Sequence, residues 1–159
     1  MSEGARLATR HDLPVVEWLV AGVREDMAPH RGGEIFLINE VGRDTPAGDL
    51  DGALTDDDAV AVVGVFDEVV FGAAFAKVRT LEDGRRIGYL HTFLVQPEAR
   101  EVGIGEAMMN LVIEELKARG CVGVDSAALP GDRESKNFFE SFGLKARLLT
   151  VHRSFDAGA

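Results

Sequence analysis

The segment with the clearest chemical signature runs from Val95 to Gly105 and leads from a predicted strand into a predicted helix. Gly103 and Gly105 stand where the helix begins, so the backbone can approach a ligand closely there. The first N–H groups of a helix lack partners within it, and the helix dipole adds positive charge at the same end. Together these features predict an anion site suited to a pyrophosphate, where Arg100 can add charge-assisted hydrogen bonds.

Two other interpretations of this segment are a structural turn and a dinucleotide-binding loop. A plain turn into the helix would need only one glycine. A dinucleotide-binding fingerprint would read G-x-G-x-x-G, with an acidic residue about 20 positions further on. Asp125 lies at that distance, but Met108 stands in place of the third glycine. The segment also comes late in the chain, after antiparallel strands, with room for a single β-α-β unit.

The motif Arg100-x-x-Gly103-x-Gly105, preceded by Val95-x-Pro97, resembles the Q/R-x-x-G-x-G/A signature of the GNAT superfamily of N-acetyltransferases. The order of predicted elements resembles that fold along almost the whole chain. The resemblance implies acetyl-CoA as co-substrate and a primary amine as acetyl acceptor. A catalytically weak acyl-CoA-binding or regulatory module is the alternative function, and a dinucleotide-dependent oxidoreductase is a more distant one.

The resemblance also implies which residues hold the co-substrate. The strand end Phe93-Leu94-Val95 is expected to bind the pantetheine arm, with backbone groups of Phe93 and Val95 pairing to it like an added strand. The neighbouring strands must part near Val95, and a β-bulge at that point is the expected device. Backbone amides are expected to hold the pyrophosphate, and they come from Arg100, Glu101, Val102, Gly103, Ile104, Gly105 and Glu106.

His91 is the best candidate for the base that takes a proton from the acceptor amine. In an alternating strand, His91, Phe93 and Val95 share one face, with Tyr89 two residues before the histidine. An unperturbed histidine titrates near ~6.5, which suits a base at neutral pH. The position resembles one at which some GNAT arylalkylamine acetyltransferases carry a catalytic histidine. A hydrogen-bonded histidine on a half-buried strand is the alternative interpretation.

The acid that protonates the CoA sulfur is harder to place. The stretch Asp132–Leu144 resembles the family pattern N-x-x-A-x-x-φ-Y-x-x-φ-G-F, in which φ is apolar and the tyrosine protonates the sulfur. Here Asp132 takes the asparagine position, and Phe139, which has no hydroxyl, takes the tyrosine position. Water, Tyr89 and Ser135 are the alternative donors, and binding without efficient turnover is a further alternative. Asp132 is expected to cap its helix or to contact CoA.

The predicted elements follow the order β-α-α-β-β-β-α-β-α-β, which implies a mixed sheet in an α/β fold. Asp12 is the expected N-cap of the first helix, and Trp18 is expected in the core. Arg43–Asp58 is expected to be a loop. Tight turns are expected at Asp67-Glu68 and at Asp83-Gly84. The predicted strands are Ala5–Thr9, Ala59–Phe66, Val69–Arg79, Ile87–Val95, Val122–Leu129 and Leu144–Phe155, and the helices are Asp12–Met27, Ile35–Val41, Ile104–Gly120 and Arg133–Phe142.

Acidic residues gather where the acceptor groove of this fold is expected, between the first helices, the following loop and the sheet. Such a cluster can attract a cationic amine, although runs of like charge are more often solvated. The acidic residues concerned are Glu25, Asp26, Glu34, Asp49, Asp51, Asp56, Asp57 and Asp58, and His30 is expected in the same groove.

Length and composition bound the remaining expectations. The 159 residues are expected to form a single domain, and the net charge of −10 argues against nucleic acid as the main partner. No apolar run reaches the ~20 residues that span a bilayer, so no membrane partner is expected. The single cysteine, Cys121, cannot form an internal disulfide, and no metal-ligand spacing is present. We expect a cytoplasmic protein, and the resemblance implies a homodimer.

Overall fold

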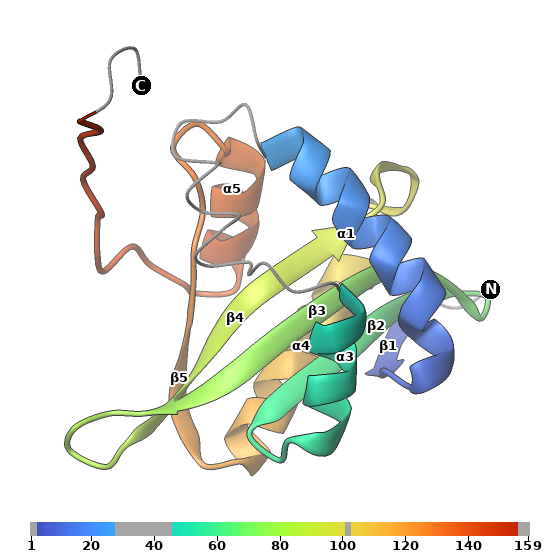
Figure 1. The fold of residues 1–159 in the computed structure, drawn as a ribbon, viewed down its shortest axis with the longest axis horizontal. Coiled ribbons are helices and arrows are strands. Elements are labelled where there is room, and N and C mark those ends of the chain that lie inside the picture. The colour runs from blue at the N-terminus through green and yellow to red at the C-terminus, as the bar shows by residue number, and fades with distance from the viewer. Residues whose placement is uncertain (1–2, 28–45, 101–102, 156–159) are drawn as a thin grey trace.

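A five-stranded mixed sheet is the framework of the protein (Figure 1), seen in a computed structural model that describes residues 3–27, 46–100 and 103–155. Neighbours in the sheet are also neighbours in the chain. The first four strands are antiparallel and the last runs parallel to the fourth, so the predicted mixed α/β fold is confirmed. The strands are β1 (Glu3–Leu7), β2 (Ala59–Phe66), β3 (Val69–Thr80), β4 (Arg86–Val95) and β5 (Cys121–Ser126).

The two predicted hairpin turns between these strands are confirmed. Asp67 and Glu68 both have positive φ, at 48° and 68°, and join β2 to β3 directly. Gly84 has a φ of 90° in the turn between β3 and β4. Such turns match the right-handed twist of paired strands, which makes them strong sequence signals.

Helices cover both faces of the sheet (Figure 1). On one face, α1 (Leu13–Met27) and α3 (Pro46–Thr55) enclose a core that includes Val16, Val63 and Phe75. On the other face, α4 (Ile104–Ala118) and α5 (Arg133–Ser141) pack over a second core that includes Leu90 and Met108. Two short 3-10 turns, η1 (Arg10–Asp12) and η3 (Pro97–Ala99), precede α1 and α4.

The helix α4 lies unusually close to the sheet because glycines stand beneath it. A Cβ atom added at Gly64 of β2 would lie 2.3 Å from Cγ2 of Ile104 and 2.4 Å from Sδ of Met108. No real Cβ makes such a contact, so α4 rests on bare backbone there. This packing fixes the N-terminus of α4 beside the end of β4, where the glycine-rich loop enters the helix.

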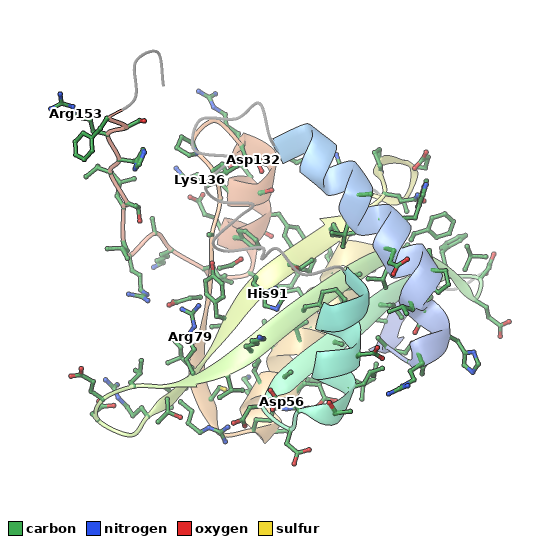
Figure 2. The ribbon with its side chains drawn as sticks, viewed as in Figure 1. Asp56, Arg79, His91, Asp132, Lys136 and Arg153 are labelled. Atoms are coloured by element: carbon green, nitrogen blue, oxygen red, sulfur yellow. The ribbon has the colours of Figure 1, made fainter. Side chains whose placement is uncertain are left out.

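The prediction of a loop over Arg43–Asp58 is wrong, because α3 occupies Pro46–Thr55. Pro46 is the first residue of the helix, a position that needs no N–H donor and suits the fixed φ of proline. Ala53 and Leu54 pack against the core of the α1 face, which stabilises the helix despite its glycines. Asp56 follows the helix at the end of the domain opposite Asp132 (Figure 2). The predicted helix Ile35–Val41 lies outside the described residues.

Two predictions for the C-terminal part are also wrong. The strand expected over Val122–Leu129 is shorter, and it is a partly exposed edge strand rather than a buried one, with Val122 65% exposed. The strand expected over Leu144–Phe155 is absent, since these residues form neither helix nor strand. A strand exists only through pairing, and this segment has no strand beside it in the described part of the chain.

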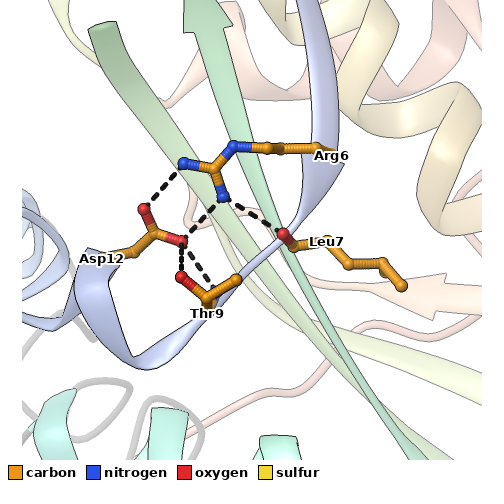
Figure 3. A network of polar contacts seen from close by, with 4 residues as sticks. All are labelled: Arg6, Leu7, Thr9 and Asp12. Carbon is orange, nitrogen blue, oxygen red and sulfur yellow. Dashed lines mark hydrogen bonds and ion pairs between the residues drawn. The ribbon is translucent and has the colours of Figure 1, made fainter. Parts of the chain in front are cut away.

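The entry into α1 differs from the prediction as well. Asp12 closes η1 instead of capping α1, and its carboxylate accepts hydrogen bonds from Arg6 at 2.9 Å and from the Thr9 amide at 2.7 Å (Figure 3). Burial raises the pKa of Asp12, but the hydrogen bonds from Arg6 and Thr9 outweigh it and bring that pKa below its ordinary value. Trp18, expected in the core, is 63% exposed on α1.

Candidate functional site

The strands β4 and β5 part about halfway along β4, and this opening is the centre of the candidate site. Their parallel pairing runs from Arg86 to Leu90 of β4 and ends at the Leu90–Ser126 pair. The Ser126 hydroxyl donates a 2.9 Å hydrogen bond to the Leu90 carbonyl at the point of parting. Beyond it, the stretch from His91 to Val95 has no strand partner on the β5 side among the described residues.

A β-bulge accompanies this opening, but it lies at His91 and not near Val95 as predicted. Phe75 of β3 pairs with Thr92, whereas the next residue, Ala76, pairs with Leu90. His91 is therefore the extra residue of β4. A bulge bends the strand and re-aims the side chains around it, which explains why the pairing with β5 stops at this place.

The bulge also corrects the prediction that His91, Phe93 and Val95 share a face. The His91 ring stacks on Phe75, with ring centroids 6.2 Å apart, and Phe75 belongs to the core under α1. Phe93 and Val95 pack against the opposite core, under α4 and α5. The candidate base therefore lies on one face of the sheet, while the apolar side chains at the strand end lie on the other.

His91 is held in a partly buried environment (Figure 2). Its Nδ1 lies 3.0 Å from Oγ1 of the buried Thr92, a contact that fixes the ring orientation. Burial, and then the positive charges of Lys77 and Arg79, lower the pKa of His91 from its ordinary value near 6.5 to about 4. The expectation of an unperturbed histidine is therefore wrong, and the imidazole is neutral throughout the physiological pH range.

The glycine-rich loop enters α4 as the sequence predicts. Gly103 is the N-cap with a φ of 83°, a left-handed conformation that glycine adopts without strain. The amides of Ile104, Gly105 and Glu106 follow in the first turn, where helical amides have no partner within the helix. A Cβ added at Gly105 would lie 3.3 Å from the Phe138 ring, so a side chain here would crowd α5. Glu101 and Val102 lie outside the described residues.

Arg100 connects this loop to its surroundings. Its Nε donates a 3.2 Å hydrogen bond to the Val95 carbonyl, and its Nη1 lies 3.3 Å from Oε1 of Glu134 on α5. The side chain is 44% exposed. Arg100 thus lies at the open end of β4, beside the predicted pyrophosphate loop, and Glu134 balances its charge.

The residues at the Asn and Tyr positions of the family pattern come from α5. Asp132 accepts a hydrogen bond from the Ser135 amide at 3.1 Å, so it is an N-cap in this structure. Phe139 contacts the Phe93 ring edge to face, with centroids 6.4 Å apart, which places it beside the open strand end. Tyr89 lies before the bulge, and the Arg79 guanidinium stands 4.0 Å from the centre of its ring.

The acidic cluster does not converge on this site. Asp56, Asp57 and Asp58 precede β2, at the end of the sheet where β4 begins, and Asp58 forms an ion pair with Arg86. Asp51 lies 3.7 Å from Arg10. The side chains of the other predicted acidic residues, and of His30, lie outside the described residues.

Burial raises the pKa of the free thiol of Cys121, which disfavours a nucleophilic role.

Sequence reasoning missed Thr92 and Ser126. Thr92 fixes the His91 ring and Ser126 marks the place where the strands part. A hydroxyl residue next to a candidate histidine was a visible signal for Thr92. Nothing in the sequence pointed to Ser126, because its role depends on the register between β4 and β5.

An α/β sheet that opens beside a glycine-rich helix N-terminus has features that suit a cofactor with an extended arm and a pyrophosphate. The model of the acetyltransferase (GNAT) family matches residues 24–144. The chain therefore belongs to the GNAT acetyltransferase family, whose co-substrate is acetyl-CoA. No curated protein matches the chain.

Solved structures share the fold over nearly the whole chain. The chain resembles a tetramutant of the BH1408 protein from Bacillus halodurans, with a TM-score of 0.79, 22% identity and coverage of 95% of this chain and 99% of that one. A ribosomal-protein-alanine N-acetyltransferase from Brucella melitensis biovar Abortus 2308 gives a TM-score of 0.70 at 15% identity, covering 98% and 100%. The structure of AAC(6')-Iy in complex with the bisubstrate analogue CoA-S-monomethyl-acetylneamine gives a TM-score of 0.70 at 18% identity, covering 97% of this chain and 99% of that one.

Two further observations concern the described residues alone. None of their helices combines the length and the apolar character that crossing a membrane requires. They also contain no group of three or more histidine, cysteine, aspartate or glutamate side chains placed to hold a metal ion.

Proposed function

We propose that this chain is an N-acetyltransferase that moves the acetyl group of acetyl-CoA to a primary amine by direct attack. The observation that carries the proposal is the opening between β4 and β5, with the first turn of α4 beside it. An unpaired strand edge suits an extended, amide-containing arm, and a helix N-terminus suits a pyrophosphate. Family membership favours combining the two into one CoA site.

The described residues fit the co-substrate. Backbone groups from Phe93 to Val95 lie along the open edge of β4, and the amides of Gly103 to Glu106 begin α4. Binding of the arm at Val95 requires its carbonyl to exchange the hydrogen bond from Arg100 for one from the ligand. Arg100 would then be free to turn from Glu134 toward phosphate oxygens, which are stronger partners for a guanidinium at this exposed position. Glu101, Val102, Asp132 and Phe139 complete the proposed set.

His91 is the proposed base, acting directly or through a water molecule. The neutral amine nitrogen attacks the thioester carbonyl, a C–N bond forms, and the C–S bond breaks. The nitrogen loses one proton, which passes to His91 or to water beside it. A pKa of about 4 keeps His91 neutral and able to accept a hydrogen bond, but it makes the imidazole a weak base. His91 is therefore proposed to orient the nucleophile and to relay its proton through water to the bulk solvent.

Protonation of the departing sulfur is assigned to water. Phe139 occupies the position of the usual acid without a hydroxyl, and a thiol of pKa near ~8.5 leaves without full assistance. Tyr89 is the alternative donor on this chain. The competing proposal, a domain that binds acyl-CoA with little turnover, is supported by the same substitution at Phe139.

The charges near His91 affect which acceptor amine the site can take. Lys77 and Arg79 are the charges that act on the pKa of His91, and none of the described aspartates is among them, although Asp58 directly precedes the residue that pairs with Lys77. A cationic acceptor rests on the acidic residues outside the described side chains, such as Glu25 and Glu34. An amine panel should therefore include polyamines and aminoglycosides together with amines that carry a carboxylate or phosphate.

The remaining proposals concern the protein as a whole. We assign residues 1–159 to one acetyltransferase domain in the cytoplasm. The acidic composition supports the exclusion of nucleic acid as the main partner.

The test is CoA release, followed with a thiol reagent, across that amine panel. Gly105→Val is the diagnostic variant, because its side chain would crowd the Phe138 ring beside the first turn of α4. Gly4→Val is the matched control, since a Cβ there meets nothing within 4 Å. We expect amine-dependent release by the wild type and the control, with a raised KM for acetyl-CoA in the variant. Acetyl-CoA binding without release for any amine would favour the weak-turnover module instead.

A further inference from the structure

Two basic side chains stand beside His91 on the face of the sheet that carries α1. Lys77 and Arg79, which we call the basic pair, are exposed residues of β3 and follow Phe75 at alternating positions, so the three side chains share a face. Phe75 belongs to the core under α1, and the His91 ring stacks on it. The basic pair therefore lies on the same face as the place proposed for the nucleophile (Figure 2).

The register of the sheet brings the basic pair close to His91. Lys77 lies opposite Tyr89, which is two residues before His91 on β4. From the rise of a strand and the spacing between strands, the backbone of Lys77 is about 8 Å from that of His91. The Arg79 guanidinium extends in the same direction, because it stands 4.0 Å from the centre of the Tyr89 ring. After burial, these two positive charges are the causes that lower the pKa of the imidazole.

The carboxylates nearest to the basic pair are held by other arginines. Asp58, which directly precedes β2, forms an ion pair with Arg86. Asp125 on β5 accepts a 2.9 Å hydrogen bond from Nε of Arg147, which is the main cause of its lowered pKa, and the charge of Arg79 is a weaker one. Neither member of the basic pair forms an ion pair with another described residue. Two cations on a chain of net charge −10 thus stand beside the site without a carboxylate partner in the described part of the chain.

The contact between Arg79 and Tyr89 prepares the guanidinium for an anion. A guanidinium that lies over an aromatic ring is attracted by the face of that ring and keeps the N–H groups at its own edge available. Those groups match two oxygens of a carboxylate or of a phosphate. Lys77 adds a compact charge with three donors on the same face of β3. The basic pair therefore has the chemistry of an anion-binding site.

We infer that the acceptor is a primary amine that also carries a carboxylate or a phosphate, and that Lys77 and Arg79 bind this anionic group while the amine lies at His91. The inference rests on the proposed function, whose acceptor it specifies. An acceptor with a second positive charge would be repelled by the basic pair, whereas an anionic group held there orients the nitrogen toward the thioester. A spacer of a few carbons between amine and anion matches the separation of about 8 Å.

Binding is measured first, in the presence of free CoA, because it requires no turnover. The probes are 5-aminopentanoate and 3-aminopropyl phosphate, with 5-amino-1-pentanol and 1,5-diaminopentane as neutral and dicationic counterparts. At fixed pH, the imidazole C–H signals of His91 should shift with either anionic amine at about tenfold lower concentration than with the counterparts. Lys77→Gln/Arg79→Gln should lose this difference, while Arg85→Gln, whose exposed charge already pairs with Asp83, should keep it. Equal binding of all the amines, or a preference that survives in the double variant, would overturn the inference.

CoA release from acetyl-CoA then separates this inference from the proposed function. We expect kcat/KM for the anionic amines to exceed that for the counterparts about tenfold, and the double variant to lose this margin at an unchanged KM for acetyl-CoA, which also shows that it folds. Lys77→Glu/Arg79→Glu should favour 1,5-diaminopentane instead. The anionic amine with the higher kcat/KM identifies the group as carboxylate or phosphate, and either result supports the inference.

Two outcomes of this assay distinguish the possible failures. Release with equal kcat/KM for all the amines would overturn the inference and leave the proposed function intact. No release with any amine, together with charge-dependent binding at His91, would overturn the proposed function, and only the anion-binding part of the inference would stand.

Discussion

Replacement of His91 by glutamine offers the sharpest test of whether the surroundings of His91 lower its pKa. In the folded chain the pKa of His91 is lowered to about 4 by burial and by Lys77 and Arg79, whereas an unfolded chain gives the ordinary 6.5. At pH 5.5, a histidine of pKa 4 is only about 3% protonated, while one of pKa 6.5 is about 90% protonated. The two situations are easily separated by an NMR titration of the imidazole C–H signals, with His91→Gln used to assign the resonance.

The same shift predicts a pH-dependent stability. Between pH 6.5 and 4 the unfolded state binds a proton that the folded state excludes, so the stabilising effect is complete above pH 6.5 and is lost as the pH falls toward 4. A difference of 2.5 pKa units corresponds to at most about 3 kcal/mol in the free energy of unfolding. Denaturant unfolding at several pH values should therefore show a steeper acid loss in the wild type than in His91→Gln.

The lowered pKa of His91 also affects how the rate of the reaction depends on pH. Because His91 stays neutral, kcat/KM between pH 5 and 7 should follow the ionisation of the acceptor amine and show no additional step near 6.5. A His91 resonance that titrates near 6.5, with equal pH dependence of stability in the two proteins, would refute the environment described for this residue.

Three further substitutions test other parts of the account. Asp12→Asn should lower the free energy of unfolding at pH 7 by about 1–3 kcal/mol, because it breaks a buried, charge-assisted contact with Arg6. This loss should shrink as the pH falls from the ordinary value of 3.8 through the lowered pKa of Asp12, and equal losses at all pH values would contradict that linkage. Phe139→Tyr should raise kcat and leave the KM for acetyl-CoA unchanged, whereas an unchanged kcat would mean that sulfur protonation does not limit the rate. Thr92→Val should reduce kcat/KM about tenfold with little effect on acetyl-CoA binding. The substitution removes a contact, worth about 1.4 kcal/mol, that fixes the orientation of the His91 ring. Full activity of this variant would show that Thr92 has no role in catalysis.

The parts of the fold that the sequence predicted are those with local causes. The turns at Asp67-Glu68 and Gly84 have backbone conformations that few residues favour, so they placed three antiparallel strands correctly. The entry into α4 was predictable for the same reason, because Gly103 is needed for a positive φ. These signals depend on neighbouring residues in the chain and not on the rest of the molecule.

The errors concern features that depend on distant partners. The bulge at His91 is invisible in a regular alternating pattern, because the register with β3 and the parting from β5 decide it. The C-terminal segment, residues 144–155, has the pattern of a strand, but no strand pairs with it in the described part of the chain. The segment of α3 reads as a loop because it contains a proline and two glycines, but Pro46 suits the first position of the helix, and the packing of Leu54 against the α1-side core outweighs the glycines. The lowered pKa of His91 likewise follows from tertiary burial.

Thermal unfolding with acetyl-CoA, beside free CoA and NADPH, tests the central claim most directly. A ligand at 100 times its Kd stabilises the folded state by about 2.7 kcal/mol, and each kcal/mol raises the Tm of a chain of this size by about 2–4 °C. We predict a Tm increase of about 5–10 °C with acetyl-CoA in the wild type, a smaller one with Gly105→Val, and none with NADPH. No increase with any CoA species would contradict the account and leave the loop from Arg100 to Gly105 as a helix entry without a ligand.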